Sequence, residues 1–272
     1  MKKQTILFLA LCVSTSALAQ SREELPPPTL SVDKPDAEPV EAVRDAKAVE
    51  ILKRANVATP KVKSFTYTAK FSVEGFNPPR LRMPDGIRMT GSFTAAMGEN
   101  GTPPKFRCEV KYTSDDTKEA QEISFGGDGD LFFFIDAKTK TVYEDIDPVV
   151  LGPRAAIGVR GLRMREYLAP TPFDDEIGGV TVELGSEHTI GDVPCHEIHV
   201  DYAGAGREAY WYFGKKDYLP RGVRRVFSND QGEKSTTTLM ITNLGVNPSF
   251  LVDPFTAIVP EGWTKNTDDV AP

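Results

Sequence analysis

The sequence of 272 residues contains only three cysteines and three histidines, so few of its side chains suit metal binding or redox chemistry. Cys12 lies in the first apolar run, whereas Cys108 and Cys195 lie in expected strands far apart in the sequence. No CxxC redox motif occurs. An oxidising compartment would permit a bond between Cys108 and Cys195, but the geometry of the fold decides whether they pair. We expect two separate buried thiols.

The sequence also lacks the motifs that assemble catalytic or metal sites. It has no nucleophile elbow, phosphate-binding loop or dinucleotide fingerprint. His196–His199 resembles a zinc-protease motif that is one residue short, and residues three apart in a strand point to opposite faces. Asp174–Glu176 is typical of a solvated loop rather than a metal site, and Gly126–Asp130 of a hairpin turn rather than a calcium-binding repeat. We therefore predict no enzymatic activity, no metal and no cofactor.

The sequence also has no excess of positive charge. The formal net charge is −7, and removing Lys2 and Lys3 with a leader would make it −7 − 2 = −9. An acidic chain is a poor partner for phosphate backbones or anionic membrane surfaces, so we predict no nucleic-acid partner. After the first apolar run, no segment is long and apolar enough to predict a transmembrane helix in the mature chain.

The first residues indicate export. Two lysines precede the apolar run Ile6–Val13, which is too short to span a bilayer, and Ala17–Ala19 forms a small-x-small cleavage site. We predict a signal peptide over residues 1–19 and a periplasmic protein. Lipid anchoring at Cys12 is disfavoured, because Leu11 stands where a small residue is expected and the cysteine comes before the apolar run ends.

A linker and one amphipathic helix follow. Residues 20–41 are rich in proline and acidic side chains, a composition that cannot bury a core and favours an extended tether. The segment Glu41–Val57 carries apolar residues at helical spacing with charged residues between them, which predicts a helix that needs a surface to pack on. Thr59-Pro60 is expected to end it.

The next three segments alternate apolar and polar residues. Phe65–Val73 has apolar side chains at every odd position, and the same period of two returns in Ile87–Met97 and Phe106–Tyr112. Three such strands in succession predict an antiparallel sheet with one apolar face.

Ser124–Tyr143 is the stretch around which the chain is organised. Asp128-Gly129 predicts a two-residue hairpin turn between two strands, and Asp136–Lys140 predicts a second turn before a third strand. Leu131–Ile135 is apolar on both faces. Such a strand is either covered on both sides or has an outer face matched by a ligand.

The rest of the chain predicts a cover and then more strands. Residues 147–177 form the one long stretch without a strand pattern, which we interpret as a lid with short helical turns. Regularly spaced strands with turn residues between them are typical of a sandwich or barrel. A curved sheet with so few helices to cover it favours a partly open hydrophobic groove. The expected strands are Val182–His188, Cys195–Tyr202, Ala209–Phe213, Gly222–Phe227 and Ser235–Asn243.

The order of these features resembles the LolA-type lipoprotein carrier family, also known as outer-membrane lipoprotein-sorting proteins. The resemblance runs roughly from Ala42 to Trp263. It rests on the helix AVEILKRA with the strand VKSFTYTAKFSVEG, on Pro104–Arg107, and on the hairpin GDGDLFFFIDAKTKTVYE. In the second half it rests on ELGSEHTIGDVPCHEIHV, on YWYFGKKDYLPRGVRRV, and on Phe255 with Pro260–Gly262.

The resemblance implies a mainly β (α+β) fold, an unclosed antiparallel β-barrel or half-barrel of about eleven strands. An N-terminal helix and a central helical lid would cover it, with a hydrophobic cavity for the acyl chains of lipoproteins. One position departs from the family pattern. Carriers that hold the lid with an arginine have it directly before the proline of the third strand, where this chain has Pro103.

These observations together predict a LolA-like domain over residues 42–265 and a C-terminal tail over residues 266–272. We predict a non-enzymatic periplasmic protein that binds lipid or lipoprotein acyl chains in a hydrophobic groove. The alternative is an envelope module with a self-filled groove that binds a protein partner or senses stress. The residues predicted to line the groove are Phe65, Tyr67, Phe71, Met89, Phe93, Phe106, Phe133, Ile135, Trp211 and Phe213.

Overall fold

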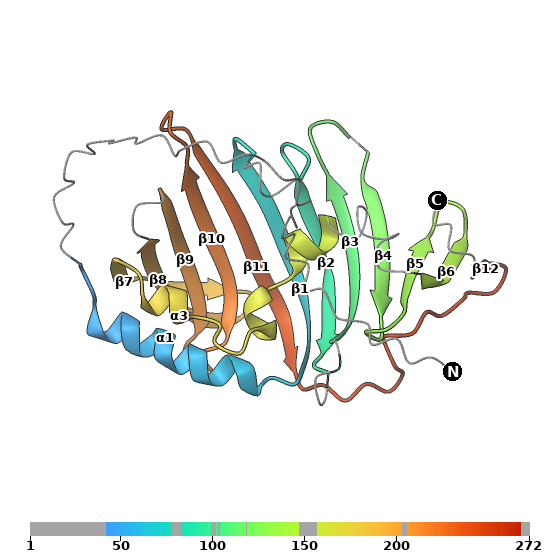
Figure 1. Ribbon diagram of the computed structural model, residues 1–272, viewed down its shortest axis with the longest axis horizontal. Helices are drawn as coiled ribbons and strands as arrows, with labels where there is room; N and C mark the ends of the chain where they lie inside the picture. The colour runs from blue at the N-terminus through green and yellow to red at the C-terminus, as the bar shows by residue number, and fades with distance from the viewer. Residues whose placement is uncertain are drawn as a thin grey trace, which may run out of the picture. The chain divides into compact units, whose positions relative to one another are not determined.

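A single sheet of twelve strands forms the scaffold, in the order β12-β6-β5-β4-β3-β2-β1-β11-β10-β9-β8-β7 (Figure 1). The computed structural model describes residues 42–77, 83–98, 102, 104–117, 119–146, 157–202 and 206–267. The strands are β1 (Ser64–Gly75), β2 (Arg88–Ala96), β3 (Lys105–Thr113), β4 (Gln121–Gly127), β5 (Phe132–Asp136), β6 (Thr141–Ile146), β7 (Thr181–Ile190), β8 (Val193–Tyr202), β9 (Arg207–Gly214), β10 (Pro220–Ser228), β11 (Lys234–Val246) and β12 (Thr264–Asn266).

The sheet consists of two meanders joined at its centre. Strands β1 to β6 pair in sequence order, β7 to β11 do the same, and β1 pairs with β11 across the middle. All of these pairs are antiparallel, and only the short β12, which follows a long connection, pairs parallel to β6. Because β7 and β12 end the sheet on its two sides, the barrel is unclosed, as predicted. The described residues form twelve strands, in keeping with the approximately eleven that the resemblance implies.

The predicted amphipathic helix is present as α1 (Ala46–Ala58). It begins five residues later than Glu41, because the Asp45 carboxylate caps it by accepting hydrogen bonds from the backbone N–H groups of Lys47 and Ala48. The residues before the cap instead form a parallel bridge to β7, at Arg44 and Val182. At the other end, the chain continues as a 3-10 turn, η1 (Thr59–Lys61). Pro60 lies in this turn and has no backbone N–H to donate.

The turn at Asp128-Gly129 is longer than predicted. Strand β4 ends at Gly127 and β5 begins at Phe132, so four residues rather than two connect them. The Asp128 carboxylate accepts hydrogen bonds from the N–H groups of Asp130 and Leu131, and Gly129 has a φ of 104°. This side-chain turn competes with a tight two-residue hairpin and explains the difference.

The expected lid is present in part. Residues 157–162 form a helical turn, followed by η2 (Arg165–Leu168) and α3 (Asp174–Ile177). We call residues 157–177 the cover segment. In Figure 1 this segment, in yellow, lies in front of the sheet, and α1, in blue, lies at the lower left of the view, toward β7 to β10. Residues 147–156 of the expected lid lie outside the described part of the chain.

Other predictions also fall outside the described residues. They concern the signal peptide at residues 1–19, Cys12, the linker at residues 20–41, Pro103, and most of the tail at residues 266–272. Among the helices that the structure describes, none has the length and apolar character needed to cross a bilayer. Cys108 on β3 and Cys195 on β8 are separate buried thiols, as predicted.

Candidate binding face

The register of the sheet determines which side chains share a face. Residues directly opposite one another on neighbouring strands point to the same side. One such row is Phe134, Phe125, Cys108, Phe93 and Tyr67, running from β5 to β1. A second row on the same side is Trp211, Val223, Leu239, Phe71 and Met89, running from β9 to β2. The cover segment packs on this side, which we call the helix-covered face.

Eight of the ten residues predicted to line a groove lie on the helix-covered face. Phe133 and Ile135 do not. They stand opposite Gly126 and Ser124 of β4, in rows that continue to Arg107 and Glu109 of β3 and point the other way. The structure therefore brings together Phe65, Tyr67, Phe71, Met89, Phe93, Phe106, Trp211 and Phe213.

Phe133 is nevertheless buried on the opposite face. Its ring fills the space above Gly126, where an added Cβ would lie 2.8 Å from the Phe133 ring. The Arg107 guanidinium lies over the same ring, 5.6 Å from its centre, and Arg107 also donates to the backbone carbonyl of Pro254. Leu131–Ile135 is therefore apolar on both faces because both faces of the strand are covered, although Leu131 itself is half-exposed.

An aromatic stack forms the centre of the helix-covered face. Phe65 and Tyr67 are parallel with ring centres 5.6 Å apart, and Phe93 stacks on both. Phe106 extends the stack from β3. Tyr167 of the cover segment approaches Phe65 to 4.8 Å between ring centres, so the cover completes the stack rather than leaving a groove above it.

The Tyr67 hydroxyl fastens the cover segment to β1. It donates to the backbone carbonyl of Leu162 at 2.8 Å and accepts from the backbone N–H of Met164 at 2.9 Å. Burial raises the pKa of this phenol well above its ordinary value, so it remains a neutral donor. One side chain of the sheet therefore satisfies two buried backbone groups of the cover.

Two glycines let the cover approach the sheet closely. A Cβ added at Gly161 would lie 2.4 Å from the Met89 sulfur, and one added at Gly158 would lie 3.2 Å from the Cys108 sulfur. The sequence showed these glycines only as interruptions of a helical pattern. In the folded chain they mark the positions where the cover lies directly on β2 and β3.

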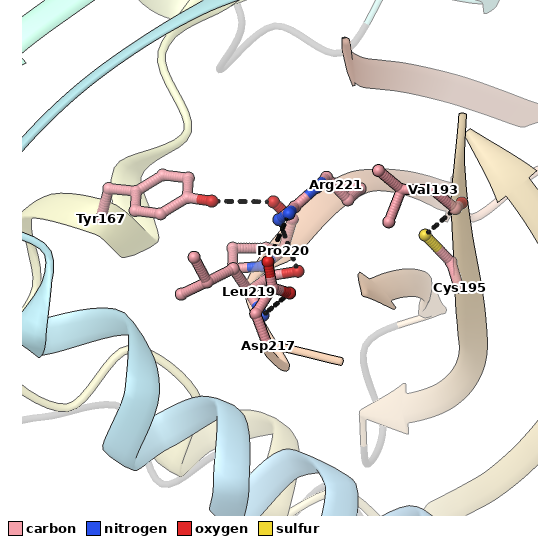
Figure 2. A network of polar contacts seen from close by, with 7 residues as sticks. All are labelled: Tyr167, Val193, Cys195, Asp217, Leu219, Pro220 and Arg221. Carbon is pink, nitrogen blue, oxygen red and sulfur yellow. Dashed lines mark hydrogen bonds and ion pairs between the residues drawn. The ribbon is translucent and has the colours of Figure 1, made fainter. Parts of the chain in front are cut away.

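A second attachment reaches β10 through Tyr167 (Figure 2). The Tyr167 hydroxyl donates to the carbonyl of Pro220 at 3.0 Å. Beside it lies the buried Arg221, whose guanidinium donates to the Asp217 carboxylate at 2.6 Å and to the carbonyl of Leu219 at 3.2 Å. A buried arginine requires such a partner, because an uncompensated charge is costly away from water.

The last part of the cover is seated over β9. Phe173 meets Trp211 and Phe213 edge-on, with ring centres 5.2 and 5.0 Å away. Glu176 is buried and accepts a hydrogen bond from the Tyr202 hydroxyl at 2.9 Å. Burial raises the pKa of Glu176 above its ordinary value of 4.5, and the bond from Tyr202 offsets only part of this effect.

The raised pKa of Glu176 predicts a pH-dependent stability. Because the folded chain binds this proton more tightly than the unfolded chain, the contribution is complete below about pH 4.5 and is lost as the pH rises through the folded pKa. Glu176→Gln keeps an acceptor for Tyr202 and should raise the melting temperature at neutral pH but not near pH 4. Melting curves across this range test it, with Asp175→Asn on the exposed neighbour as the control. Equal pH profiles for Glu176→Gln and the wild type would contradict the assignment.

Two hollows of the described residues lie away from the helix-covered face. One of about 410 Å³ is lined by Ser92, Glu109, Lys111 and Ser124 among others, on the opposite face. The other, of about 590 Å³, lies between Val43–Asp45 and β7. The helix-covered face is instead filled by apolar side chains of the cover, namely Leu162, Met164, Tyr167 and Phe173.

Sequence reasoning missed these cover residues. Leu162, Met164 and Tyr167 are separated by charged residues in the stretch Arg160–Leu168, which has no clear period of two or 3.6. The strand residues that these side chains contact, such as Phe65 and Tyr67, lie about 100 positions away in the sequence. The one signal in the sequence for a buried cover was the pair of apolar residues Leu162 and Met164, which flank Arg163.

The chain is similar in structure to several solved proteins. No protein-family model matches the chain, and no curated protein matches it. LprF from Mycobacterium bovis aligns with 79% of this chain and 100% of its own, at 10% identity and a TM-score of 0.47. MucB aligns with 78% of this chain and 63% of its own, at 14% identity and a TM-score of 0.42. A LolA superfamily protein from Nitrosomonas europaea aligns with 77% of this chain and 97% of its own, at 8% identity and a TM-score of 0.29. These solved structures include a member of the LolA superfamily, which the sequence also resembles.

Proposed function

We propose that this chain is an exported, non-enzymatic protein that binds the acyl chains of lipids or lipoproteins on its helix-covered face. The observation that carries the proposal is the attachment of the cover segment. The segment fills an aromatic and aliphatic face of the sheet. Its first part is fastened there by the Tyr67 hydroxyl, and its later part by Glu166, Tyr167 and Glu176. An acyl chain would take the place of the cover side chains.

The energies of such an exchange are close to balanced. Burial of Leu162, Met164, Tyr167 and Phe173 contributes about 1.5–3 kcal/mol for each side chain. An acyl chain gains about 0.8 kcal/mol per CH₂ removed from water, so roughly a dozen such groups contribute about 10 kcal/mol. The two totals are of the same order. We therefore expect reversible binding, with the cover acting as an internal competitor.

Tyr67→Phe tests this proposal. The variant keeps the aromatic stack but leaves the Leu162 carbonyl and the Met164 N–H without their buried partner, at a cost of about 2 kcal/mol to the closed cover. If the cover competes with the ligand, the affinity for a dansyl-labelled fatty acid should rise by about tenfold or more. Fluorescence titration of the purified, delipidated protein measures it.

Tyr210→Phe is the matched control. Tyr210 lies on the face opposite the cover, where its hydroxyl donates to Glu208 at 3.1 Å. Its removal should leave the affinity for the fatty acid unchanged. Absence of fatty-acid binding by both the wild type and the folded Tyr67→Phe variant would refute the proposed function.

A second candidate function, binding of an envelope protein, is favoured by an exposed apolar run. Phe250, Leu251 and Val252 lie in the connection between β11 and β12, and Leu251 is fully exposed. The run is ordered by Asp253, whose carboxylate accepts from the N–H of Phe255, and by the packing of Phe250 on Phe255. Photo-crosslinking from position 251 in cells would show one discrete protein product, whereas crosslinks to lipid alone would reject this candidate.

A further inference from the structure

The cover segment carries an arginine, Arg163, whose charge has no ion-pair partner among the residues that the structure describes. Arg163 lies between the two residues that the Tyr67 hydroxyl holds, so its backbone is fixed over the centre of the helix-covered face. Its side chain is partly buried, and its Nε atom is shielded from solvent and makes no hydrogen bond. Among the described residues, none forms an ion pair with this guanidinium.

The surroundings of Arg163 do not compensate for this charge. Burial lowers the pKa of Arg163, and Arg165, a like charge two positions away, lowers it further. The acidic neighbour Glu166 is already paired with Arg225 of β10 at 3.1 Å. A partly desolvated and unpaired guanidinium is costly, and it is relieved by an anion that accepts its hydrogen bonds.

Arg221 shows what a satisfied buried arginine looks like in the same protein. Its guanidinium has both a carboxylate and a backbone carbonyl as acceptors, supplied by Asp217 and Leu219. Within the described part of the chain, the buried Arg221 therefore has an acidic partner, whereas the partly buried Arg163 forms no ion pair. The difference is that Arg163 lies on the segment that an acyl ligand would displace.

We infer that Arg163, assisted by Arg165, is the binding site for the anionic head of an acyl ligand, a phosphate or a carboxylate. The inference rests on the proposed function and adds a ligand class to it. The acyl chain would take the place of the cover side chains, while the head group would pair with the guanidinium at the edge of the displaced segment. A phosphate could belong to a lipid head group or be free in solution.

Lysophosphatidic acid and monoacylglycerol with the same acyl chain form the test pair, because they differ only by the phosphate. Wild-type protein should bind lysophosphatidic acid about tenfold more tightly, since a hydrogen bond to a charged group is worth that much. Arg163→Gln should abolish this preference, so that the variant binds the two lipids with equal affinity. Arg88→Gln, which removes an exposed arginine from β2, is the control and should retain the preference.

The outcomes separate the two proposals. Binding of neither lipid by the wild type would refute acyl binding itself. Binding of both lipids with equal affinity, or a preference that survives Arg163→Gln, would refute the head-group site alone. Glycerol 3-phosphate is the remaining probe. Competition at equal concentration would identify a site for free phosphate esters and overturn the lipid assignment, whereas no competition supports a lipid head group.

Discussion

Gly158→Cys should close the helix-covered face permanently and abolish acyl binding. A Cβ at position 158 would lie 3.2 Å from the sulfur of Cys108 on β3, a separation close to that of a disulfide-bonded pair. The natural thiol therefore supplies half of a bond between the cover segment and the sheet. If acyl chains enter only when the cover leaves, the bonded protein should bind a dansyl-labelled fatty acid at least about a hundredfold more weakly, and reductant should restore binding.

The bond must form while the chain folds. Burial raises the pKa of the Cys108 thiol to about 12, so the thiolate needed for exchange is scarce in the folded protein. Production in an oxidising compartment, where both thiols are exposed before folding, avoids this barrier. Thiol counting by mass spectrometry before and after reduction confirms the bond.

Two controls separate the bond from the added side chain. Gly158→Ser introduces a similar volume without a bond, and Gly158→Cys combined with Cys108→Ser removes the natural thiol. Both should retain binding of the fatty acid, and reductant should not change their affinity. Full binding by the bonded protein would mean that acyl chains do not enter beneath the cover.

The sequence predicted the sheet more successfully than it predicted which side chains face the cover. Alternation in Phe65–Val73 correctly assigned all of its odd positions to the buried face, because one side of β1 is apolar and the other polar. In Phe132–Asp136 both faces are apolar, so periodicity could not decide, and Phe133 and Ile135 were assigned to the wrong face. The register to Gly126 and Ser124 of β4 resolves the ambiguity.

The cover could not be predicted for a different reason. The roles of Tyr67 and Gly158 depend on contacts with residues about 95 and 50 positions away. A tyrosine in an alternating strand is most simply explained as core, and a glycine in a poor helix as a break. Only the folded chain shows that the hydroxyl holds the cover and that the glycine permits its close approach.

Gly91→Ala should destabilise the protein by about 3 kcal/mol or more, the largest stability effect that we expect from a single methyl group. Gly91 lies in the middle of β2, opposite Val110 of β3, and an added Cβ would lie 2.0 Å from the backbone carbonyl oxygen of Glu109. A backbone atom cannot rotate away as a side chain can. The same Cβ would also lie 2.8 Å from Leu162, so both the strand pair and the cover must move.

Urea unfolding measures the change in the free energy of unfolding, and Gly178→Ala is the matched control. Gly178 follows α3, and a Cβ there would lie 3.4 Å from the Asp174 carbonyl oxygen, an ordinary contact. We expect that variant to remain within about 0.5 kcal/mol of the wild type. Because Leu162 is displaced together with the β2–β3 pair, Gly91→Ala should also weaken the closed cover. A variant as stable as the wild type would show that β2 and β3 are not paired in the register on which the helix-covered face depends.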